Sequence, residues 1–128
     1  MAILTYAALA ERHACRRQLR KFKRRFGYSV NITVKLCVAE AEHFDFWWAA
    51  TCLLAGTYRR KWLRVRDAAF KRYAAAQDHA YDLNGFSDEY EAARAAANTT
   101  YEQEKAAAFA RLYNEQCKPA PLKSELRS

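Results

Sequence analysis

Residues 57–82 read TYRRKWLRVRDAAFKRYAAAQDHAYD, and this order of apolar and charged residues predicts one long helix. The apolar residues recur in steps of three and four, which places them on one helical face. This stripe, which we expect to be buried, consists of Tyr58, Trp62, Val65, Ala69, Tyr73, Ala76 and Ala80. Thr57 is the expected N-terminal cap, and Asn84 with Gly85 marks the expected end because glycine accepts a positive φ.

A second long helix is predicted downstream. Ser87 can cap its first turn, which is rich in acids that suit the positive end of the helix dipole, and the pattern continues to about Gln116. Because only a few residues connect the two helices, they should form an antiparallel hairpin. We expect Tyr101→Ala to cost roughly 3 kcal/mol of stability if that ring is buried. The residues expected to face the first helix are Tyr90, Ala93, Ala97, Tyr101, Ala108 and Leu112.

The two long helices share an internal repeat. Trp62 and Tyr73 are eleven residues apart, as are Tyr90 and Tyr101, and eleven residues span about three helical turns. Trp62, Tyr90 and Tyr101 are each followed by two alanines, six and seven residues further on. The alternative interpretation is that helices rich in alanine and tyrosine repeat by chance.

Length and composition predict one helical domain. The chain has 128 residues, of which 52% are apolar and 14% aromatic, with only three Gly and two Pro. So few helix breakers favour long uninterrupted elements, and the length supports a single hydrophobic core. We expect an all-α fold, a compact bundle of about five helices over residues 1–116 with a long C-terminal antiparallel hairpin. Pro119 and Pro121 predict a flexible C-terminal tail over residues 117–128.

The first half of the chain predicts two further helices. Residues 6–26 fit a helix that begins after Thr5 and ends at Gly27. Residues 46–55, FWWAATCLLA, fit a short helix capped by Asp45 and stopped by Gly56. This segment is apolar on nearly every side, which predicts a buried central helix or one side of an interface, and both remain open for Trp47 and Trp48.

Residues 28–38 fit both a strand and a helix. Apolar residues alternate with polar or small ones from Tyr28 to Val38, which is typical of a strand. The spacing of Val34, Cys37 and Val38 instead fits a helix capped by Thr33 or Asn31. A strand needs a partner, and no other segment of the chain reads as one. We therefore expect a helix.

No catalytic or cofactor motif is recognisable. The sequence has no glycine-rich phosphate loop, no G-x-S-x-G and no H-E-x-x-H. His13 with Cys15, or Cys37 with His43, lacks the close ligand spacing of a zinc site. We expect no enzyme activity, no metal and no cofactor, and the four cysteines should be reduced.

The net charge of +8 is concentrated in the first part of the chain. Residues 1–72 hold 16 of the 22 Lys and Arg but only 5 of the 14 acids, and residues 73–128 have a net charge of −3. Such a surface favours an anionic partner, namely nucleic acid, an acidic protein face or anionic lipid. An ordinary solvated charged face is the competing interpretation.

Two groups of cations are the candidate partner-binding residues. No acid lies between Arg12 and Arg25, so repulsion on that helix is not relieved by neighbours. The second group lies on the faces of residues 57–82 that the apolar stripe leaves free, and the two groups can form one broad positive surface. The candidates are Arg16, Arg17, Arg20, Lys21 and Arg24 in the first group and Arg59, Arg60, Lys61, Arg64, Arg66 and Lys71 in the second.

The expected location is the cytoplasm, without membrane contact. The first ten residues, MAILTYAALA, lack the positive charge that opens a signal peptide. No apolar run approaches the ~20 residues that span a bilayer.

Residues 62–73, WLRVRDAAFKRY, and 101–113, YEQEKAAAFARLY, resemble segments of small bacteriophage accessory proteins. In that group the C-terminal helices repeat an aromatic residue, a charged stretch and an Ala-Ala pair. The order of CVAEAE and FDFWWAATCLLA before the repeats is also similar, so the resemblance extends over residues 14–116. This chain carries arginine and lysine where glutamate is commoner in the first repeat. The resemblance implies a phage or prophage origin and no particular activity.

Three hypotheses for the function follow. The first is stoichiometric binding to a host complex, as in anti-CRISPR and other anti-defence inhibitors, which the resemblance implies by analogy. The basic helical surface would then contact an acidic face of a host protein or ribonucleoprotein, or its nucleic acid. The second is a DNA- or RNA-binding accessory protein, which the cation groups suggest. The third is a virion assembly protein whose hairpin packs against copies of itself.

Overall fold

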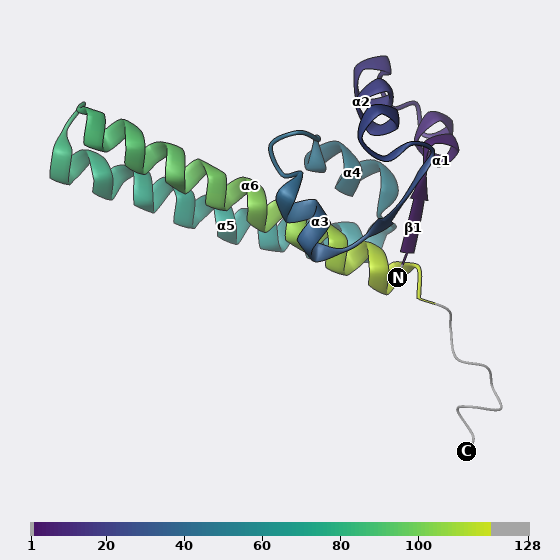
Figure 1. Ribbon diagram of the computed structural model, residues 1–128. Helices are drawn as coiled ribbons and strands as arrows, with labels where there is room; N and C mark the ends of the chain where they lie inside the picture. Colours follow the sequence, from purple (N-terminus) through teal and green to yellow (C-terminus); the bar gives the residue numbers. More distant parts are fainter. Residues whose placement is uncertain (1, 119–128) are drawn as a thin grey trace.

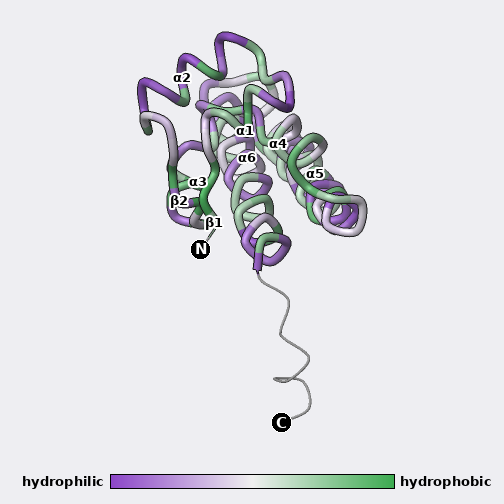
Figure 2. Tube along the Cα trace, turned by 90° about the vertical axis from the view of Figure 1, so that its right-hand side faces the viewer, coloured by the Kyte–Doolittle hydropathy of each residue, from purple (hydrophilic) through white to green (hydrophobic). Residues whose placement is uncertain are grey.

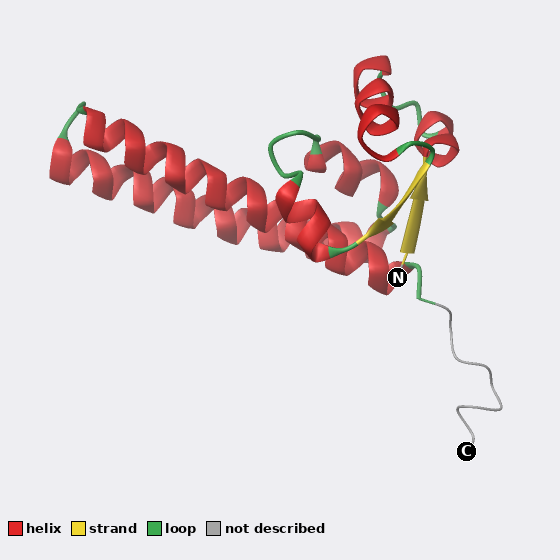
Figure 3. Cartoon of the chain, in the orientation of Figure 1, coloured by secondary structure: helices red, strands yellow, loops and turns green. Residues whose placement is uncertain are grey.

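The computed structural model describes residues 2–118, so residues 119–128 of the predicted tail lie outside the described part. Figure 1 shows two long helices side by side, with the shorter elements gathered around one end of this pair. Within the described part there are six helices and two strands, so the all-α prediction is right only approximately (Figure 3). In chain order they are β1 (Ala2–Thr5), α1 (Tyr6–Glu11), α2 (Arg16–Phe26), β2 (Ser29–Ile32), α3 (Val34–Ala39), α4 (Phe46–Leu53), α5 (Gly56–Asn84) and α6 (Asp88–Gln116).

The predicted long hairpin is confirmed by α5 and α6, which have 29 residues each. Gly85 ends α5 with a φ of 60°, a value that glycine adopts without strain. The Ser87 hydroxyl then accepts a hydrogen bond from the Tyr90 N–H and caps α6. The predicted seam residues that the hairpin buries are Trp62, Ala69, Ala80, Tyr90, Ala108 and Leu112.

The prediction of buried residues is wrong at the edges of this seam. Val65, Ala76 and Ala93 are exposed, although their spacing placed them on the inward face. Where two helices pack, each covers only a narrow strip along the surface of the other. A residue that lies roughly 60° around the helix axis from the centre of this strip stays exposed to solvent unless a third element covers it. The outer half of the hairpin extends beyond the other elements, as Figure 1 shows.

The start of α5 also differs from the prediction. The helix begins at Gly56, and Ala55 rather than Thr57 is the N-cap, without a side-chain cap. Gln116, at the end of α6, accepts a hydrogen bond from the Ala55 N–H and donates one to the Leu53 carbonyl at 2.9 Å. The end of α6 therefore supports the junction between α4 and α5, which no local pattern could indicate.

The helix predicted over residues 6–26 is two helices. Thr5 caps α1 and Gly27 ends α2 with a φ of 76°, as expected, but the chain turns between them. His13 takes a φ of 63° at this turn, which is uncommon for a residue other than glycine. The turn lets Leu9 of α1 and Phe22 of α2 both reach the core, where each is buried.

A two-stranded antiparallel sheet replaces the first part of the helix predicted over residues 28–38. β2 pairs with β1 in the register Ala2 with Ile32 through Thr5 with Ser29, so the strand partner is the very start of the chain. The second part of the prediction is correct, because α3 follows and the Thr33 hydroxyl caps it. The Asn114 side chain of α6 clamps both strands: its Nδ2 donates to the Ile32 carbonyl, and its Oδ1 accepts from the Ala2 N–H, each at 2.7 Å.

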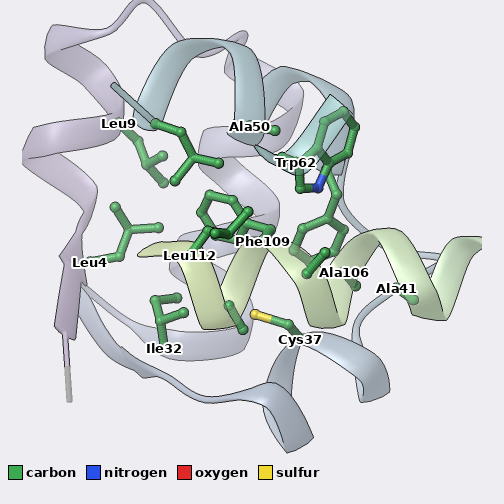
Figure 4. Close-up of a cluster of buried hydrophobic side chains, with 14 of the residues drawn as sticks. Leu4, Leu9, Ile32, Cys37, Ala41, Ala50, Trp62, Ala106, Phe109 and Leu112 are labelled. Atoms are coloured by element: carbon green, nitrogen blue, oxygen red, sulfur yellow. The ribbon is translucent and has the colours of Figure 1, made fainter. Parts of the chain in front are cut away.

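The core lies at the base of the hairpin, where every shorter element contributes a side chain (Figure 4). Trp62 is completely buried, and its indole N–H donates to the Lys105 carbonyl at 3.0 Å. Phe109 is also buried and contacts Phe46 of α4 with ring centroids 5.7 Å apart. Figure 4 labels core residues from these elements, among them Leu4, Leu9, Ile32, Cys37, Ala50, Trp62 and Phe109.

Candidate binding surface

α2 presents one apolar face to the protein and cations everywhere else. Its sequence, RRQLRKFKRRF, contains seven Arg and Lys and no acid. Phe22 is buried, and Phe26 packs between Phe22 at 5.3 Å and Phe44 at 5.7 Å, measured between ring centroids. The helix is therefore anchored by its rings, and six of its seven cationic residues are exposed. Figure 2 shows α2 at the edge of the molecule as a largely hydrophilic segment.

Two cations of α2 are used to hold the helix in place. Arg25 forms an ion pair with Glu40 at 2.6 Å, and Glu40 is the largely buried partner of the two. Lys21, one of the candidate binding residues, donates to the His43 carbonyl and lies over the Phe44 ring at 5.8 Å. These contacts fix α2 against the segment that follows α3, so Lys21 serves within the fold.

The remaining α2 cations form an open positive surface, which we call the α2 surface. All five of its side chains belong to exposed residues, and none of them makes an ion pair within residues 2–118. In a helix without acids, such charges repel one another and are relieved only by solvent ions or by a partner. The α2 surface consists of Arg16, Arg17, Arg20, Lys23 and Arg24.

An exposed aromatic ring borders the α2 surface. Tyr28 is 64% exposed, and the Lys23 ammonium lies over its ring at 5.2 Å. The interaction with the Tyr28 side chain raises the pKa of Lys23 above its ordinary value. The Tyr28 ring also contacts Tyr6 edge-on, with centroids 5.8 Å apart. A flat ring is thus held beside cations at the end of α2.

The candidate cations of α5 are more engaged with their own chain. Arg66 is half-buried, with its guanidinium over Trp47 at 5.2 Å and over Phe70 at 5.4 Å, and it pairs with Asp67 at 3.1 Å. The hydrogen bond to Asp67 raises the pKa of Arg66 above its ordinary value. Lys61 pairs with Glu115 at 3.5 Å. The cations of α5 that make no ion pair within the described residues form the α5 surface, namely Arg59, Arg60, Arg64 and Lys71.

The structure separates the two cationic surfaces. In Figures 1 and 2, α4 lies between α2 and α5. Trp47, on α4, is 45% exposed and its ring covers the buried Trp62 at 5.6 Å between centroids, so this residue belongs partly to the core and partly to the surface. Trp48 is half-buried and packs against the core. Two members of the α5 surface also make hydrogen bonds within the chain, since Arg59 donates to the Leu54 carbonyl and Arg60 to the Thr57 hydroxyl.

The geometry within residues 2–118 contains no group of three or more His, Cys, Asp or Glu side chains that could hold a metal. A largely apolar pocket of about 70 Å³ lies beneath α2, and its lining includes Phe22, Val30, Phe44 and Phe109. This is less than half the ~150 Å³ of a cavity that takes benzene. Cys37 also lines it, and burial raises the pKa of this thiol to about 12, so the thiol stays protonated and unreactive.

Comparisons with models of protein families, with curated proteins and with solved structures gave no match for this chain. None of the helices between residues 2 and 118 carries an apolar stretch of the length that crossing a bilayer requires.

The far end of the hairpin carries exposed apolar residues that the sequence motifs did not indicate. Leu83 and Phe86, on either side of the Asn84 and Gly85 turn, are 69% and 83% exposed, and Tyr81 beside them is 45% exposed. The signal was present, since a turn between two helices is usually polar and this one is flanked by large apolar residues.

Proposed function

We propose that the protein acts by stoichiometric binding rather than catalysis, and that the α2 surface is where an anionic partner docks. The observation that carries this proposal is the α2 surface itself, in which five exposed cations share one helix without an acid. Their mutual repulsion is a cost in the free protein that a negatively charged partner removes. Because Phe22 and Phe26 anchor the opposite face, binding needs no rearrangement of α2.

The biological role that fits this chemistry is inhibition of a host defence complex. The resemblance to small phage accessory proteins supports this role, as does the small size of a domain built around one core. The inhibitor would occupy an acidic face of a nuclease complex or the path of its nucleic acid in the host cytoplasm. The α5 surface would then act as a secondary contact, since Arg64 and Lys71 are exposed on it.

Phage plaque formation tests this role. The chain is expressed in bacterial strains that each carry one nuclease-based defence system, and restoration of plaques is scored against an empty vector. The double variant Arg20→Glu/Arg24→Glu should lose the effect, whereas the matched variant Arg64→Glu/Lys71→Glu on α5 should retain most of it. Equal activity of both variants, or wild-type protein that leaves every defence intact, contradicts the proposal.

Nucleic-acid binding is the second candidate, and the Tyr28 ring specifically favours it. An exposed aromatic ring beside Lys23, on a helix rich in cations, offers a base a stacking surface next to phosphate-binding groups, which is typical of proteins that bind single strands. Such binding would be independent of sequence, because α2 contacts phosphates rather than base edges.

Fluorescence anisotropy with single-stranded and double-stranded oligonucleotides tests this second candidate. The logarithm of affinity should fall linearly with the logarithm of salt concentration, and Tyr28→Ala should weaken single-strand binding by about 1–3 kcal/mol. The affinity of the Tyr28→Ala variant for double-stranded oligonucleotides should change little, because the bases of a duplex are already stacked on one another. A flat salt dependence would rule out phosphate binding by the cations, and equal losses for both kinds of oligonucleotide would rule out the stacking role of Tyr28.

A further inference from the structure

The far end of the hairpin exposes a preformed apolar cluster, which we call the hairpin tip and which consists of Tyr81, Leu83 and Phe86. Phe86 is 83% exposed, and its ring lies 4.7 Å from Tyr81 and 5.6 Å from Tyr90 between centroids. Tyr90 is buried beneath them and its hydroxyl accepts a hydrogen bond from Gln77, so the rings stand on a fixed base. Exposed apolar side chains held in this way are typical of an interaction site.

Carboxylates surround the hairpin tip. Residues 78–91 contain five acids and no Lys or Arg. Glu91 lies 3.9 Å from Arg94, and the other four acids make no ion pair within the described part of the chain. These four, all exposed, are Asp78, Asp82, Asp88 and Glu89.

The hairpin tip and the α2 surface have complementary chemistry. Guanidinium groups bind carboxylates through paired hydrogen bonds and also lie flat against aromatic rings. The hairpin tip offers both features to cations, and the α2 surface offers unpaired arginines. Each surface therefore supplies what the other lacks.

The two surfaces cannot meet within one molecule. Figure 1 shows the hairpin tip at one end of the molecule and α2 near the other. The 29 residues of α5 alone extend about 43 Å at 1.5 Å per residue. Contact between these surfaces therefore requires a second copy of the chain.

We propose that two copies of this chain form an antiparallel pair in which the hairpin tip of each docks on the α2 surface of the other. A twofold axis between them makes the two contacts identical and closes the assembly at two copies. The inference does not rest on the proposed function. It adds a form of regulation to it, because the pair covers the α2 surface and an anionic partner must compete for it.

Sedimentation of the purified full-length chain over a range of concentrations measures this pairing directly. We expect a transition from one copy to two, with no larger species. The dissociation constant should rise at least tenfold between about 0.05 M and about 0.5 M NaCl, because salt screens the charges of exposed surfaces. Phe86→Ser should weaken pairing by roughly tenfold or more, since a central aromatic contact carries much of the affinity of an interface.

Charge-swap variants identify the two surfaces. Asp78→Arg/Asp82→Arg changes the charge of the five acids around the hairpin tip from −5 to −1, and Arg20→Glu/Arg24→Glu changes the charge of the α2 surface from +5 to +1. Each variant alone should pair more weakly than the wild type, because both of its contacts lose attraction. An equal mixture of the two should pair more tightly than either variant alone, because one of its two contacts then joins an unchanged hairpin tip to an unchanged α2 surface. Arg64→Glu/Lys71→Glu, with the same change in net charge as the α2 variant, should pair like the wild type.

Three results overturn the proposal: a single copy at every concentration in low salt, pairing that the substitutions leave unchanged, or a mixture that pairs no more tightly than either variant alone. Assemblies of more than two copies would mean that the contact between the hairpin tip and the α2 surface forms but does not close into a pair, which rejects the proposed twofold arrangement. All the substituted residues are exposed, and circular dichroism verifies that the variants fold. The plaque and oligonucleotide experiments are evaluated separately from pairing, so failure of one proposal leaves the other standing.

Discussion

Trp62 is the single residue on which the base of the hairpin most depends. It is completely buried, it donates to the Lys105 carbonyl, and Trp47 covers it. We expect Trp62→Ala to lower the free energy of unfolding by about 3–5 kcal/mol, because it leaves both a large cavity and an unpaired carbonyl. Urea denaturation followed by circular dichroism measures this loss.

Phe86 provides the control for that experiment. Its ring is 83% exposed, so Phe86→Ala should change the stability of the single copy by less than about 0.5 kcal/mol. Equal losses at Trp62 and Phe86 would mean that the core is not at the base of the hairpin.

Tyr101 contributes less to stability than the sequence pattern suggests. The ring is half-buried, it stacks on Tyr73 at 5.6 Å, and Lys105 lies over it at 4.4 Å. Because solvent already reaches the ring, Tyr101→Ala should cost about 1–2 kcal/mol instead of the roughly 3 kcal/mol expected for a buried one. The same urea titration checks this, and a loss equal to that of Trp62→Ala would show that the ring is part of the main core.

Cys37 couples stability to alkaline pH. Its pKa is raised from 9.0 to about 12 by burial, so the folded protein keeps a proton that the unfolded chain releases above pH 9.0. This contribution to stability is fully present below pH 9.0 and is lost as the pH rises toward about 12. The urea concentration at the midpoint of unfolding should therefore decrease less with rising pH in Cys37→Ala than in the wild type. Urea titrations at several pH values over this range measure the difference. Identical pH profiles for the two proteins would contradict the buried thiol.

At the scale of single elements, the small sheet depends on α6. Asn114 forms hydrogen bonds with Ala2 of β1 and Ile32 of β2, and among residues 2–118 neither strand has a further strand beside it. A lone two-stranded pair is marginal in water, so Asn114→Ala should destabilise the protein by about 1–3 kcal/mol and free the strands first. In the Asn114→Ala variant, amide hydrogen exchange should accelerate relative to the wild type more in β1 and β2 than in α5. Uniform acceleration across all elements would mean that the sheet is held by other contacts.

Local capping rules predicted four of the helix starts correctly but failed at Thr57, where Ala55 is the N-cap. Thr5, Thr33, Asp45 and Ser87 were expected as caps, and each accepts the hydrogen bond that the rule requires. β2 was missed because its strand pattern is only decisive when a partner is known, and that partner is the start of the chain. Local patterns cannot report such pairing, because the paired residues lie 24 to 30 positions apart in the chain.

On the scale of the whole molecule, charge and shape divide the protein into two ends. The base carries the α2 surface, and the hairpin tip carries acids and exposed rings. The sequence predicted the excess of cations correctly, because counting charges needs no coordinates. It did not separate the open cations from those that serve the fold, such as Lys21 and Arg66, since their partners His43 and Trp47 are brought close only by tertiary packing.

The most direct test of the α2 surface as the docking site is the salt concentration that elutes the protein from a heparin column, a generic polyanion. Arg20→Glu/Arg24→Glu and Arg64→Glu/Lys71→Glu have identical net charges, so only the position of the charge differs. We predict that the α2 variant elutes at much lower salt than the wild type, whereas the α5 variant elutes close to it. Elution of both variants at the same salt concentration would mean that only the total charge matters and would contradict the account.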